Sequence, residues 1–452
     1  MTNLKRRTIL AGIPAALTTI LAGIPAALTT GALAACGSST EEAAAGKPAD
    51  LDAALEKGGK LTYWTWTPSG EDQAKAFMDQ YPNVEVEVVN AGTATDEYTA
   101  LQNAVAAGSG APDVAQIEYY ALQQFSLSDS LVDLTQYGFA DLEDQYTAST
   151  WGAVNLGGIY GLPQDSGPMV MLYNQAVFDE FGIEVPTTWD EYVAAAQALH
   201  AADPGKYLTN DAGDPGFAQP LMWQAGGHPY TVDGTDVKID LQDEGTRRWA
   251  DMWNQMLEPG LLAPISTWSD DWWKALSDGT VSSLIIGAWM PGILEGSVPD
   301  GAGDWRVAPV PSYDGSPATA ENGGSAQSVL KQSKDPALAA AFLRWLNSSE
   351  ESVDVFLGSG GFPSTTADLT SEEFLSVAPE YFGGQKINEV LVAASENVVP
   401  GFEYLPYQVY ANSVFPDTVG TAYTELSDLN AGLTAWQETL VTYGESQGFK
   451  VN

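Results

Sequence analysis

Two short segments of this chain place aromatic rings next to groups that accept hydrogen bonds. Trp64 and Trp66 close a run of β-branched and aromatic residues, and Glu118 and Tyr119 follow the apolar run 114–117. Indole and phenol rings stack on the apolar faces of ring-shaped ligands, and a carboxylate accepts hydrogen bonds or exchanges a proton. These positions can therefore hold a hydroxyl-rich ring or, with a second carboxylate nearby, perform acid–base chemistry.

The segments around these residues alternate between strand and helix patterns. The predicted elements of this first half are strands over 61–66, 84–89 and 114–117 and helices over 71–81 and 96–107. Such alternation predicts parallel α/β layers, whose strands end at the edge where ligands bind. We expect Glu118 and Tyr119 at that edge, against the alternative of a solvated acidic loop. We expect Trp66, beside Pro68, to reach the site, whereas Trp64 suits the core equally well.

The second half continues in the same style. Its predicted elements are a strand over 169–173, a hairpin over 232–241, and helices over 175–181, 189–200, 244–257, 336–347 and 418–443. Thr188 and Glu191 have the spacing of a capping box, in which each side chain satisfies the other residue's amide. No fixed-period repeat occurs after the leader, which argues against a solenoid or a propeller.

The composition limits the possible partners and the size of the core. The chain carries 59 Asp and Glu against 18 Lys and Arg, a net charge of −41. Such a surface repels nucleic acid and anionic lipid, so we expect no nucleic-acid partner. The 14 Trp, 19 Tyr and 14 Phe supply ample apolar surface for a folded core. A chain of 452 residues exceeds the size of one core, which predicts two lobes.

The first 35 residues predict a signal peptide. Basic residues at 5–7 precede an apolar stretch, and the segment 33–36 resembles a bacterial lipobox that ends at Cys36, the single cysteine. We expect Cys36 to be diacylated and to hold the protein on the outer face of the cell membrane. Residues 36–57 are predicted to form a flexible tether. A membrane-spanning anchor is the alternative, and the export route, general or twin-arginine, stays open.

Several enzyme classes lack their residues. Only His200 and His228 exist, so a histidine-dependent triad is hard to build. Asp211 and Asp214 lack the spacing of a calcium loop and predict a turn. No phosphate-binding loop of the Gly-x-x-x-x-Gly-Lys type occurs. We therefore expect no metal, no cofactor and no ATPase activity, while a secreted glycoside hydrolase stays open because many carboxylates are present.

A series of short motifs runs in order through most of the chain after the leader. They are Ala111-Pro112-Asp113-Val114, Leu131-Val132-Asp133-Leu134, Gly161-Leu162-Pro163, Leu172-Tyr173-Asn174, Val185-Pro186-Thr187-Thr188-Trp189-Asp190-Glu191, Gly226-Gly227, Gly287-Ala288-Trp289, Ser333-Lys334-Asp335-Pro336 and Phe342-Leu343-Arg344-Trp345-Leu346. In this order they resemble family 1 extracellular solute-binding proteins, the sugar-capturing subunits of bacterial ABC importers.

The resemblance implies an α/β fold of the two-lobed, type II periplasmic-binding-protein kind, with strands that cross between the lobes. By analogy one lobe comprises 58–162 plus 324–361, and the other 165–321 plus 364–452. The crossings then fall near Pro163, 322–324 and 361–363. Glycines at such points permit the backbone change that hinge closure needs.

The resemblance also implies which side chains hold a ligand. Gln164, Asp165 and Ser166 directly follow the first crossing, and Trp289 matches the tryptophan of the family's Gly-x-Trp motif. The alternatives are a turn at 165–167 and a buried strand that includes Trp289. Further candidates are Trp223, Gln224, Trp268, Asp270, Asn322, Gly323 and Tyr404.

The function that the resemblance implies is a lipid-anchored, monomeric protein that binds a sugar, most simply an oligosaccharide, and delivers it unaltered to the permease subunits of an ABC transporter. Two other interpretations stay open besides the hydrolase. The same fold could bind a polyamine through several carboxylates, or iron through paired tyrosines such as Tyr119 and Tyr120.

Overall fold

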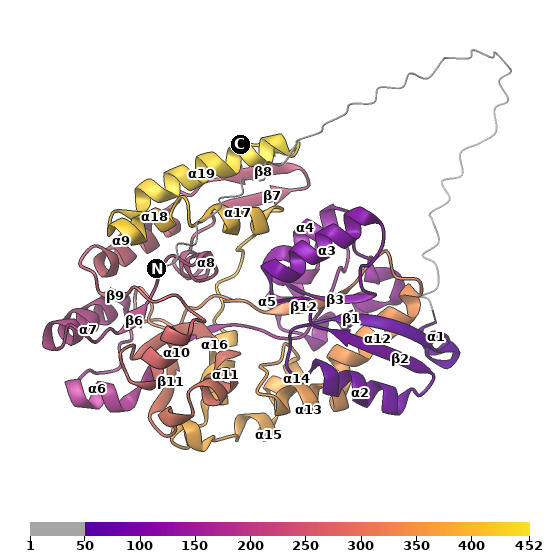
Figure 1. Cartoon of the computed structure of the whole chain (residues 1–452), viewed down its shortest axis with the longest axis horizontal. Helices are drawn as coiled ribbons and strands as arrows, with labels where there is room; N and C mark the ends of the chain where they lie inside the picture. The colour runs from indigo at the N-terminus through magenta and orange to yellow at the C-terminus, as the bar shows by residue number, and fades with distance from the viewer. Residues whose placement is uncertain (1–49) are drawn as a thin grey trace, which may run out of the picture. The chain divides into compact units, whose positions relative to one another are not determined.

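The computed structural model describes residues 50–452. The predicted signal peptide, Cys36 and most of the predicted tether lie outside this part. The buried hydrophobic side chains of the described part form three clusters. Figure 1 shows two lobes. One cluster belongs to the first lobe, and two flank the central sheet of the second lobe.

A five-stranded sheet in the order β2-β1-β3-β12-β4 forms the centre of the first lobe. Its strands are β1 (Gly59–Trp64), β2 (Val84–Val89), β3 (Val114–Glu118), β4 (Leu162–Pro163) and β12 (Ser325–Val329). The predicted parallel arrangement holds for β1, β2 and β3, whereas β12 runs antiparallel to both of its neighbours. The helices of this lobe are α1 (Leu51–Lys57), α2 (Gly70–Gln80), α3 (Thr95–Ala107), α4 (Tyr119–Leu127), η1 (Leu134–Tyr137), η2 (Phe139–Gln145), α5 (Ala148–Val154), α12 (Pro336–Ser348) and α13 (Glu350–Gly358).

Helix α1 corrects the prediction that a flexible tether extends to residue 57. Asp50 caps the helix by accepting a hydrogen bond from the amide of Ala53 at 3.1 Å. Leu51 and Ala54 are buried, and the helix packs on α12. Two buried side chains on one helical face fix this turn on the body, so the ordered chain begins before Lys60.

The second lobe is built on a three-stranded sheet in the order β10-β5-β11. Its strands are β5 (Met169–Asn174), β10 (Ser283–Gly287) and β11 (Trp305–Pro309). β5 is antiparallel to both neighbours, whereas β10 and β11, which a helical crossover joins, run in the same direction as each other. Met169 and Met171 face one hydrophobic cluster and Val170 and Leu172 the other, as strand alternation requires.

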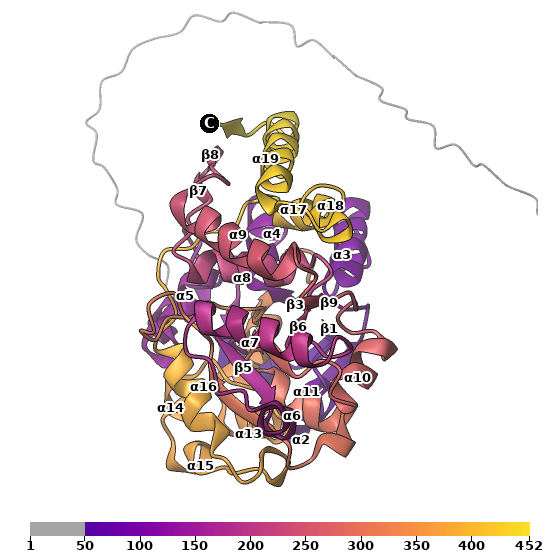
Figure 2. The same ribbon diagram turned by 90° about the vertical axis from the view of Figure 1, so that its left-hand side faces the viewer.

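Helices and short strands make up the rest of this lobe. The helices are α6 (Gln175–Phe181), α7 (Trp189–Ala202), α8 (Pro215–Gln224), α9 (Glu244–Leu257), α10 (Asp270–Ser277), α11 (Met290–Ser297), η3 (Pro299–Gly301), α14 (Thr366–Leu369), α15 (Glu372–Leu375), η4 (Glu380–Phe382), α16 (Ile387–Ser395), α17 (Gln408–Val414), α18 (Gly420–Glu425) and α19 (Leu429–Ser446). The short strands are β6 (Thr209–Asn210), β7 (Tyr230–Asp233), β8 (Asp236–Ile239), β9 (Leu262–Ala263) and β13 (Lys450–Val451). β7, β8 and α19 lie apart from β5, at the top of Figure 2. The predicted hairpin is confirmed as β7–β8, and the capping box of Thr188 and Glu191 is present.

The helix predicted over 418–443 is two helices, α18 and α19. Leu426 ends α18 with a left-handed backbone (φ 51°). The Asp428 side chain then caps α19 by accepting from the amide of Asn430 at 2.9 Å. The residues on both sides favour helix, so the periodicity alone does not reveal the break.

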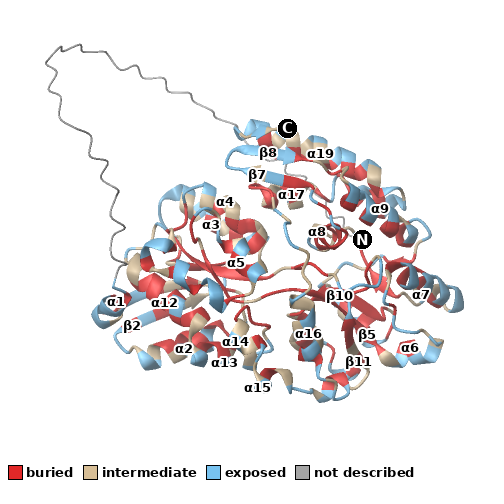
Figure 3. Ribbon diagram, turned by 180° about the vertical axis from the view of Figure 1, so that it is seen from behind, coloured by how far each residue is buried: buried red, intermediate tan, exposed pale blue. Residues whose placement is uncertain are grey.

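Three segments that are distant in sequence lie side by side where the lobes join. The ribbons that run between the lobes are largely buried (Figure 3). Asp165 forms a β-bridge with Pro363, and Pro168 forms one with Glu321. These segments include the three predicted crossings. The exact lobe limits stay a prediction.

Candidate ligand-binding site

A cavity of about 740 Å³ opens where the carboxyl ends of β1 and β3 face the second lobe. This volume falls within the ~300–1,000 Å³ typical of small-molecule sites. Trp66 follows β1 and Glu118 ends β3. They lie near each other because parallel strands finish at one edge of a sheet. The second lobe contributes Trp289, which follows β10, and Phe217 from the first turn of α8.

Aromatic side chains supply much of the cavity wall. Those among the described residues are Trp66, Tyr120, Phe217, Trp268, Trp272, Trp289, Phe356 and Tyr404. Trp268 stacks on Trp289, with ring centroids 5.9 Å apart and planes 24° from parallel. Its side chain is 49% exposed and its backbone is left-handed (φ 68°), a strained conformation for tryptophan. Strain of this kind gathers at ligand sites, where the surroundings hold it in place.

Trp289 sits in a cradle of glycines at the junction of the lobes. A Cβ added at Gly167, Gly287 or Gly323 would lie 3.0, 2.3 or 3.2 Å from its indole nitrogen. That nitrogen donates a hydrogen bond to the carbonyl of Asn322 at 2.7 Å. The edge of the indole is therefore fixed against the connecting segments.

Four carboxyl groups line the cavity, and none of its described lining residues is Lys, Arg or His. Burial raises the pKa of Glu118 to about 7 and the pKa values of Asp165 and Asp211 to about 6. Burial also raises the pKa of Asp214. With no cation to balance these groups, the cavity disfavours anionic ligands and suits neutral ones that donate hydrogen bonds.

Protein donors hold these carboxyl groups in place. The Tyr98 hydroxyl donates to Glu118 Oε2 at 3.1 Å. The amide and hydroxyl of Ser325 both donate to Asp165 Oδ1, at 2.7 and 2.6 Å. These bonds fix the rotamers of the acids, so the site is formed before a ligand arrives.

Asn322 ties the junction to α8. Pro220 has no amide hydrogen, so the carbonyl of Gly216 loses its helical partner. Asn322 Nδ2 donates to that carbonyl at 2.7 Å, and Asn322 Oδ1 accepts from the amide of Gly287 at 3.3 Å. Both ends of the Asn322 amide thus bond to protein, although the residue lines the cavity.

The structure brings about half of the predicted site residues to this cavity. They are Trp66, Glu118, Asp165, Trp268, Trp289, Asn322, Gly323 and Tyr404. Tyr119 and Trp223 instead line a second cavity, which Tyr404 also borders. Asp270 is an exposed residue at the start of α10 and lines neither.

Three predicted residues are buried away from both cavities. Gln224 accepts from Trp189 Nε1 at 2.9 Å, and its own amide donates to two backbone carbonyls. Ser166 donates to Glu321 at 3.2 Å, and Gln164 accepts from Gln327 Nε2 at 2.7 Å. Each forms hydrogen bonds that hold the protein itself together.

Several lining residues were missed in the sequence. Asn210 and Phe217 carry no local signal. Asp211 and Asp214 do form the predicted turn, in which the amide of Gly213 donates to Asp211 Oδ1 at 2.8 Å, but both also line the cavity. The spacing of these two acids, three positions apart at a turn, was the one sequence signal that could have placed them at the site.

The sequence suggests a role for Tyr120 only as half of an iron-binding tyrosine pair. It lines the first cavity, whereas Tyr119 lines the second. The two side chains therefore do not meet at one site.

Residues 50–452 lack two features. No helix in this part of the chain is long and apolar enough to cross a membrane. No group of three or more His, Cys, Asp or Glu within it is arranged to hold a metal ion.

Comparisons with known proteins agree with this geometry. The family described as bacterial extracellular solute-binding protein matches residues 63–353. An ABC transporter associated binding protein from Bifidobacterium animalis subsp. lactis Bl-04, solved with β-1,6-galactobiose, is 41% identical, with a TM-score of 0.81 over 87% of this chain and 99% of that one. The galacto-N-biose-/lacto-N-biose I-binding protein of Bifidobacterium longum is 29% identical, with a TM-score of 0.76 over 88% and 99%.

A relative known from its sequence agrees as well. The lactose-binding protein of Rhizobium radiobacter is 25% identical over 350 residues, which cover 73% of this chain and 80% of that protein. The chain therefore belongs to the bacterial extracellular solute-binding protein family.

Proposed function

We propose that this chain captures a short oligosaccharide outside the cytoplasm and passes it unaltered to the permease of an ABC importer. The cavity between the lobes carries the proposal. Sugars present apolar C–H faces and rings of hydroxyl groups. A wall of aromatic rings and carboxyl groups with no Lys, Arg or His among its described residues matches both features.

The names of the relatives narrow the ligand class. β-1,6-Galactobiose, lacto-N-biose and lactose are all disaccharides with a β-linked galactose. We infer a β-galactosyl disaccharide as the ligand of this chain. The cavity of about 740 Å³ supports a ligand of this size.

The ligand contacts are proposals of the same kind. Trp66 and Glu118 of the first lobe offer a ring face and carboxyl oxygens, Trp289 of the second lobe offers another ring face, and Asp165 offers carboxyl oxygens at the junction. Tyr404 adds a third ring. Contacts from both lobes stabilise the closed arrangement, which the permease would recognise.

Calorimetry with a sugar panel tests the function. Galactobiose, lactose, lacto-N-biose, galactose and a maltose control are titrated into the purified chain, and the mixtures are then assayed for released monosaccharide. We expect tight binding of a β-galactosyl disaccharide, weaker binding of galactose, and no product. Monosaccharide release at enzymatic rates would favour the glycoside hydrolase, and a panel without any binding would refute the proposal.

We also propose that Cys36 carries the lipid anchor. We propose lobes of 58–162 plus 324–361 and of 165–321 plus 364–452, with helix α1 (Leu51–Lys57) added to the first because it packs on α12. In the native host, Cys36→Ala should move the protein from the membrane fraction to the soluble extracellular fraction. Membrane retention of this variant would instead favour a spanning segment.

A further inference from the structure

A second cavity of about 870 Å³ also lies between the lobes. Its first wall comes from α4, α5 and the turn after α5, including Gln123, Ser149 and Asn155. Its second wall comes from the β7–β8 hairpin and the segment 395–404, including Phe402. Because each wall belongs to a different lobe, the width of this cavity changes whenever the lobes move.

Neighbouring residues show that the two cavities lie on opposite sides of the junction. Tyr120 and Asn322 line the first cavity, whereas their chain neighbours Tyr119 and Glu321 line the second. Tyr404 borders both. The connecting segments therefore form a thin partition, and a rotation about it that narrows one cavity widens the other.

The partition is bonded across the lobes. Ser149 Oγ of α5 donates to Glu321 Oε1 at 2.8 Å, and the amide of Gly167 donates to Glu321 Oε2 at 2.7 Å. Burial raises the pKa of Glu321, which is 4% exposed. Glu321 is thus occupied by protein donors, and a ligand must use other groups.

Aromatic rings on the second wall offer a stacking surface. Trp223 and Phe402 are stacked with centroids 4.9 Å apart and planes 9° from parallel. Tyr404 stands at 80° to Phe402 with centroids 5.3 Å apart. Trp223 belongs to the last turn of α8, the helix whose first turn lines the sugar cavity. One rigid helix therefore reaches from one cavity to the other.

The polar lining selects the ligand class. Glu396 and Glu403 add carboxylates, and none of the described lining residues is Lys, Arg or His, so anions are disfavoured. Gln123 and Asn155 supply amide groups that donate as well as accept, and the Ser149 hydroxyl, which donates to Glu321, can still accept. An organic cation would not need hydrogen-bond donors from the protein, whereas a neutral hydroxyl-rich ring uses both donors and acceptors. The lining therefore favours the neutral ring.

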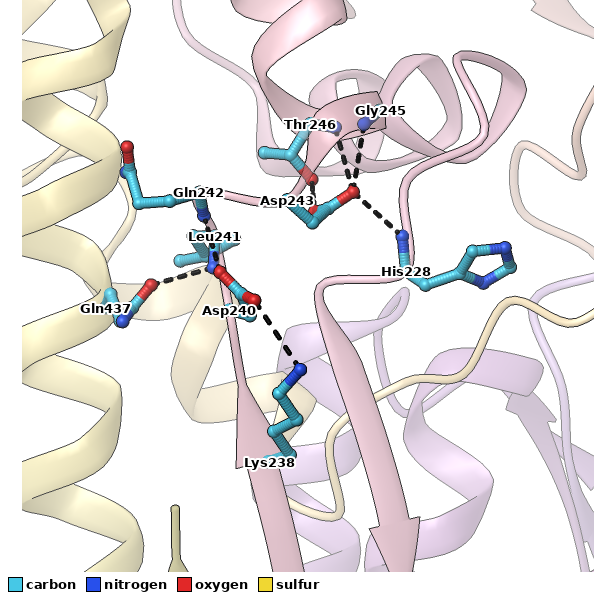
Figure 4. Close-up of polar contacts among 9 residues, drawn as sticks. All are labelled: His228, Lys238, Asp240, Leu241, Gln242, Asp243, Gly245, Thr246 and Gln437. Carbon is cyan, nitrogen blue, oxygen red and sulfur yellow. Dashed lines mark hydrogen bonds and ion pairs between the residues drawn. The ribbon is translucent and has the colours of Figure 1, made fainter.

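The hairpin wall is fixed in place before any ligand binds (Figure 4). Asp243 caps α9 and accepts from the amide of His228, which precedes the hairpin, at 3.2 Å. The amide of Leu241, which follows it, donates to Gln437 of α19 at 2.7 Å. Glu403 accepts from the amide of Val232 at 2.7 Å, which joins the hairpin to the aromatic segment.

We propose that this second cavity is a carbohydrate site whose occupation tightens sugar binding in the first. An occupant between the two walls resists their approach, and opening of the first cavity requires that approach. Sugar bound in the first cavity is therefore released more slowly when the second is filled. The coupling is reciprocal, so sugar in the first cavity also tightens binding in the second. The proposal rests on the proposed function only for the identity of the ligand in the first cavity.

Calorimetry on the full-length folded chain tests the proposal with β-1,6-galactobiose as the probe. We expect two events per chain, one tight and one weak. Phe402→Ala and, independently, Glu396→Gln should weaken the weak event at least ten-fold and leave the tight one in place. Phe181→Ala, which alters a part-buried phenylalanine of α6 outside both cavities, is the matched control and should change neither.

Kinetics measure the coupling. Filling the second cavity should slow dissociation from the first about five-fold or more, and Phe402→Ala should abolish that effect. A single event at every sugar concentration, or loss of the tight event in both second-cavity variants, would overturn the proposal. So would binding of tetramethylammonium, but not sugar, in a Phe402-dependent manner. If no tight event occurs in the unmodified chain while the weak one does, the proposed function fails and the second site stands.

Discussion

Trp289 joins the ligand cavity to the lobe junction through one side chain. Its ring lines the cavity, while its edge fills a space that only glycines leave open at 167, 287 and 323. A ligand that stacks on the ring therefore presses on a group that is bonded to the carbonyl of Asn322. The contacts that position the Trp289 ring are therefore the ones on which its role in ligand binding depends.

The first prediction concerns this residue. Trp289→Ala should weaken sugar binding by about 2 kcal/mol or more, because a desolvated aromatic contact is lost. Calorimetry measures the affinity, and circular dichroism checks that the fold persists. Trp273→Ala is the control, since Trp273 belongs to the same tryptophan cluster but does not line the cavity. Equal affinity of Trp289→Ala and the unmodified chain would remove this ring from the site.

The buried carboxyl groups make stability depend on pH. Glu118 has an ordinary pKa of 4.5, and burial, opposed by hydrogen bonds from Tyr98 and Tyr120, raises it to about 7 in the folded chain. The folded state then binds more protons than the unfolded state between these values, so the free energy of unfolding falls as pH rises from about 4.5 to 7. Above pH 7 this contribution stays constant.

Glu118→Gln should therefore flatten part of that decline. Urea unfolding of the ligand-free chain between pH 4.5 and pH 8 measures it. Glu71→Gln, which changes an exposed carboxylate on α2, should leave the slope as it is. A steeper decline in Glu118→Gln would contradict the assignment.

At the scale of elements, the break between α18 and α19 contains a removable strain. Leu426 is 51% exposed and has a left-handed backbone, which costs roughly 1–2 kcal/mol in a residue with a Cβ. Leu426→Gly should raise the free energy of unfolding by up to about 1 kcal/mol, because glycine adopts this conformation freely but loses more entropy. Thermal unfolding measures it. Leu429→Gly, at a fully buried position of α19, should lower stability instead.

The elements that the sequence predicts well are those with a local cause. The position of Trp66 and Glu118 at the carboxyl edge of the first sheet followed from parallel alternation, although β1 ends at Trp64, before the predicted end at Trp66, and β3 includes Glu118. The start of α7 followed from its capping box. The break at Leu426 has no such signal. Nor could local patterns show that α8 directs Phe217 toward one cavity and Trp223 toward the other, because the packing of distant segments sets the position of that helix.

At the scale of the whole molecule, the connecting segments have two tasks. They hold the lobes together through bridges such as Asp165 to Pro363, and they separate two cavities that respond oppositely to rotation. Side chains of these segments must fit between the two cavities, so some of them point into the protein and not into a cavity. This explains why predicted site residues such as Ser166 and Gln164 bond to protein groups instead of lining a cavity.

Gly324 lies in one of the connecting segments, where the space for a side chain is small. It has a left-handed backbone (φ 87°), and an added Cβ would lie 2.7 Å from the ring of Tyr119, which bonds to the carbonyl of Asp165 at 2.8 Å. Gly324 and Tyr119 belong to the same proposed lobe, whereas the bond from Tyr119 to Asp165 crosses to the other. Gly324→Ala should therefore displace the Tyr119 ring from this bond and disturb the lobe junction. We expect sugar binding at least ten-fold weaker, and loss of the contraction on sugar addition that small-angle scattering should detect in the unmodified chain.

Gly182→Ala separates this effect from backbone strain alone. Gly182 caps α6 with a left-handed backbone (φ 64°), and nothing lies within 4 Å of an added Cβ. Both variants carry a similar strain of roughly 1–2 kcal/mol, so both should unfold more easily. Only Gly324→Ala should lose affinity and contraction. If the two variants bound sugar equally well, backbone strain alone would account for any loss of affinity. Lobe movement would then not depend on the contact between Gly324 and Tyr119.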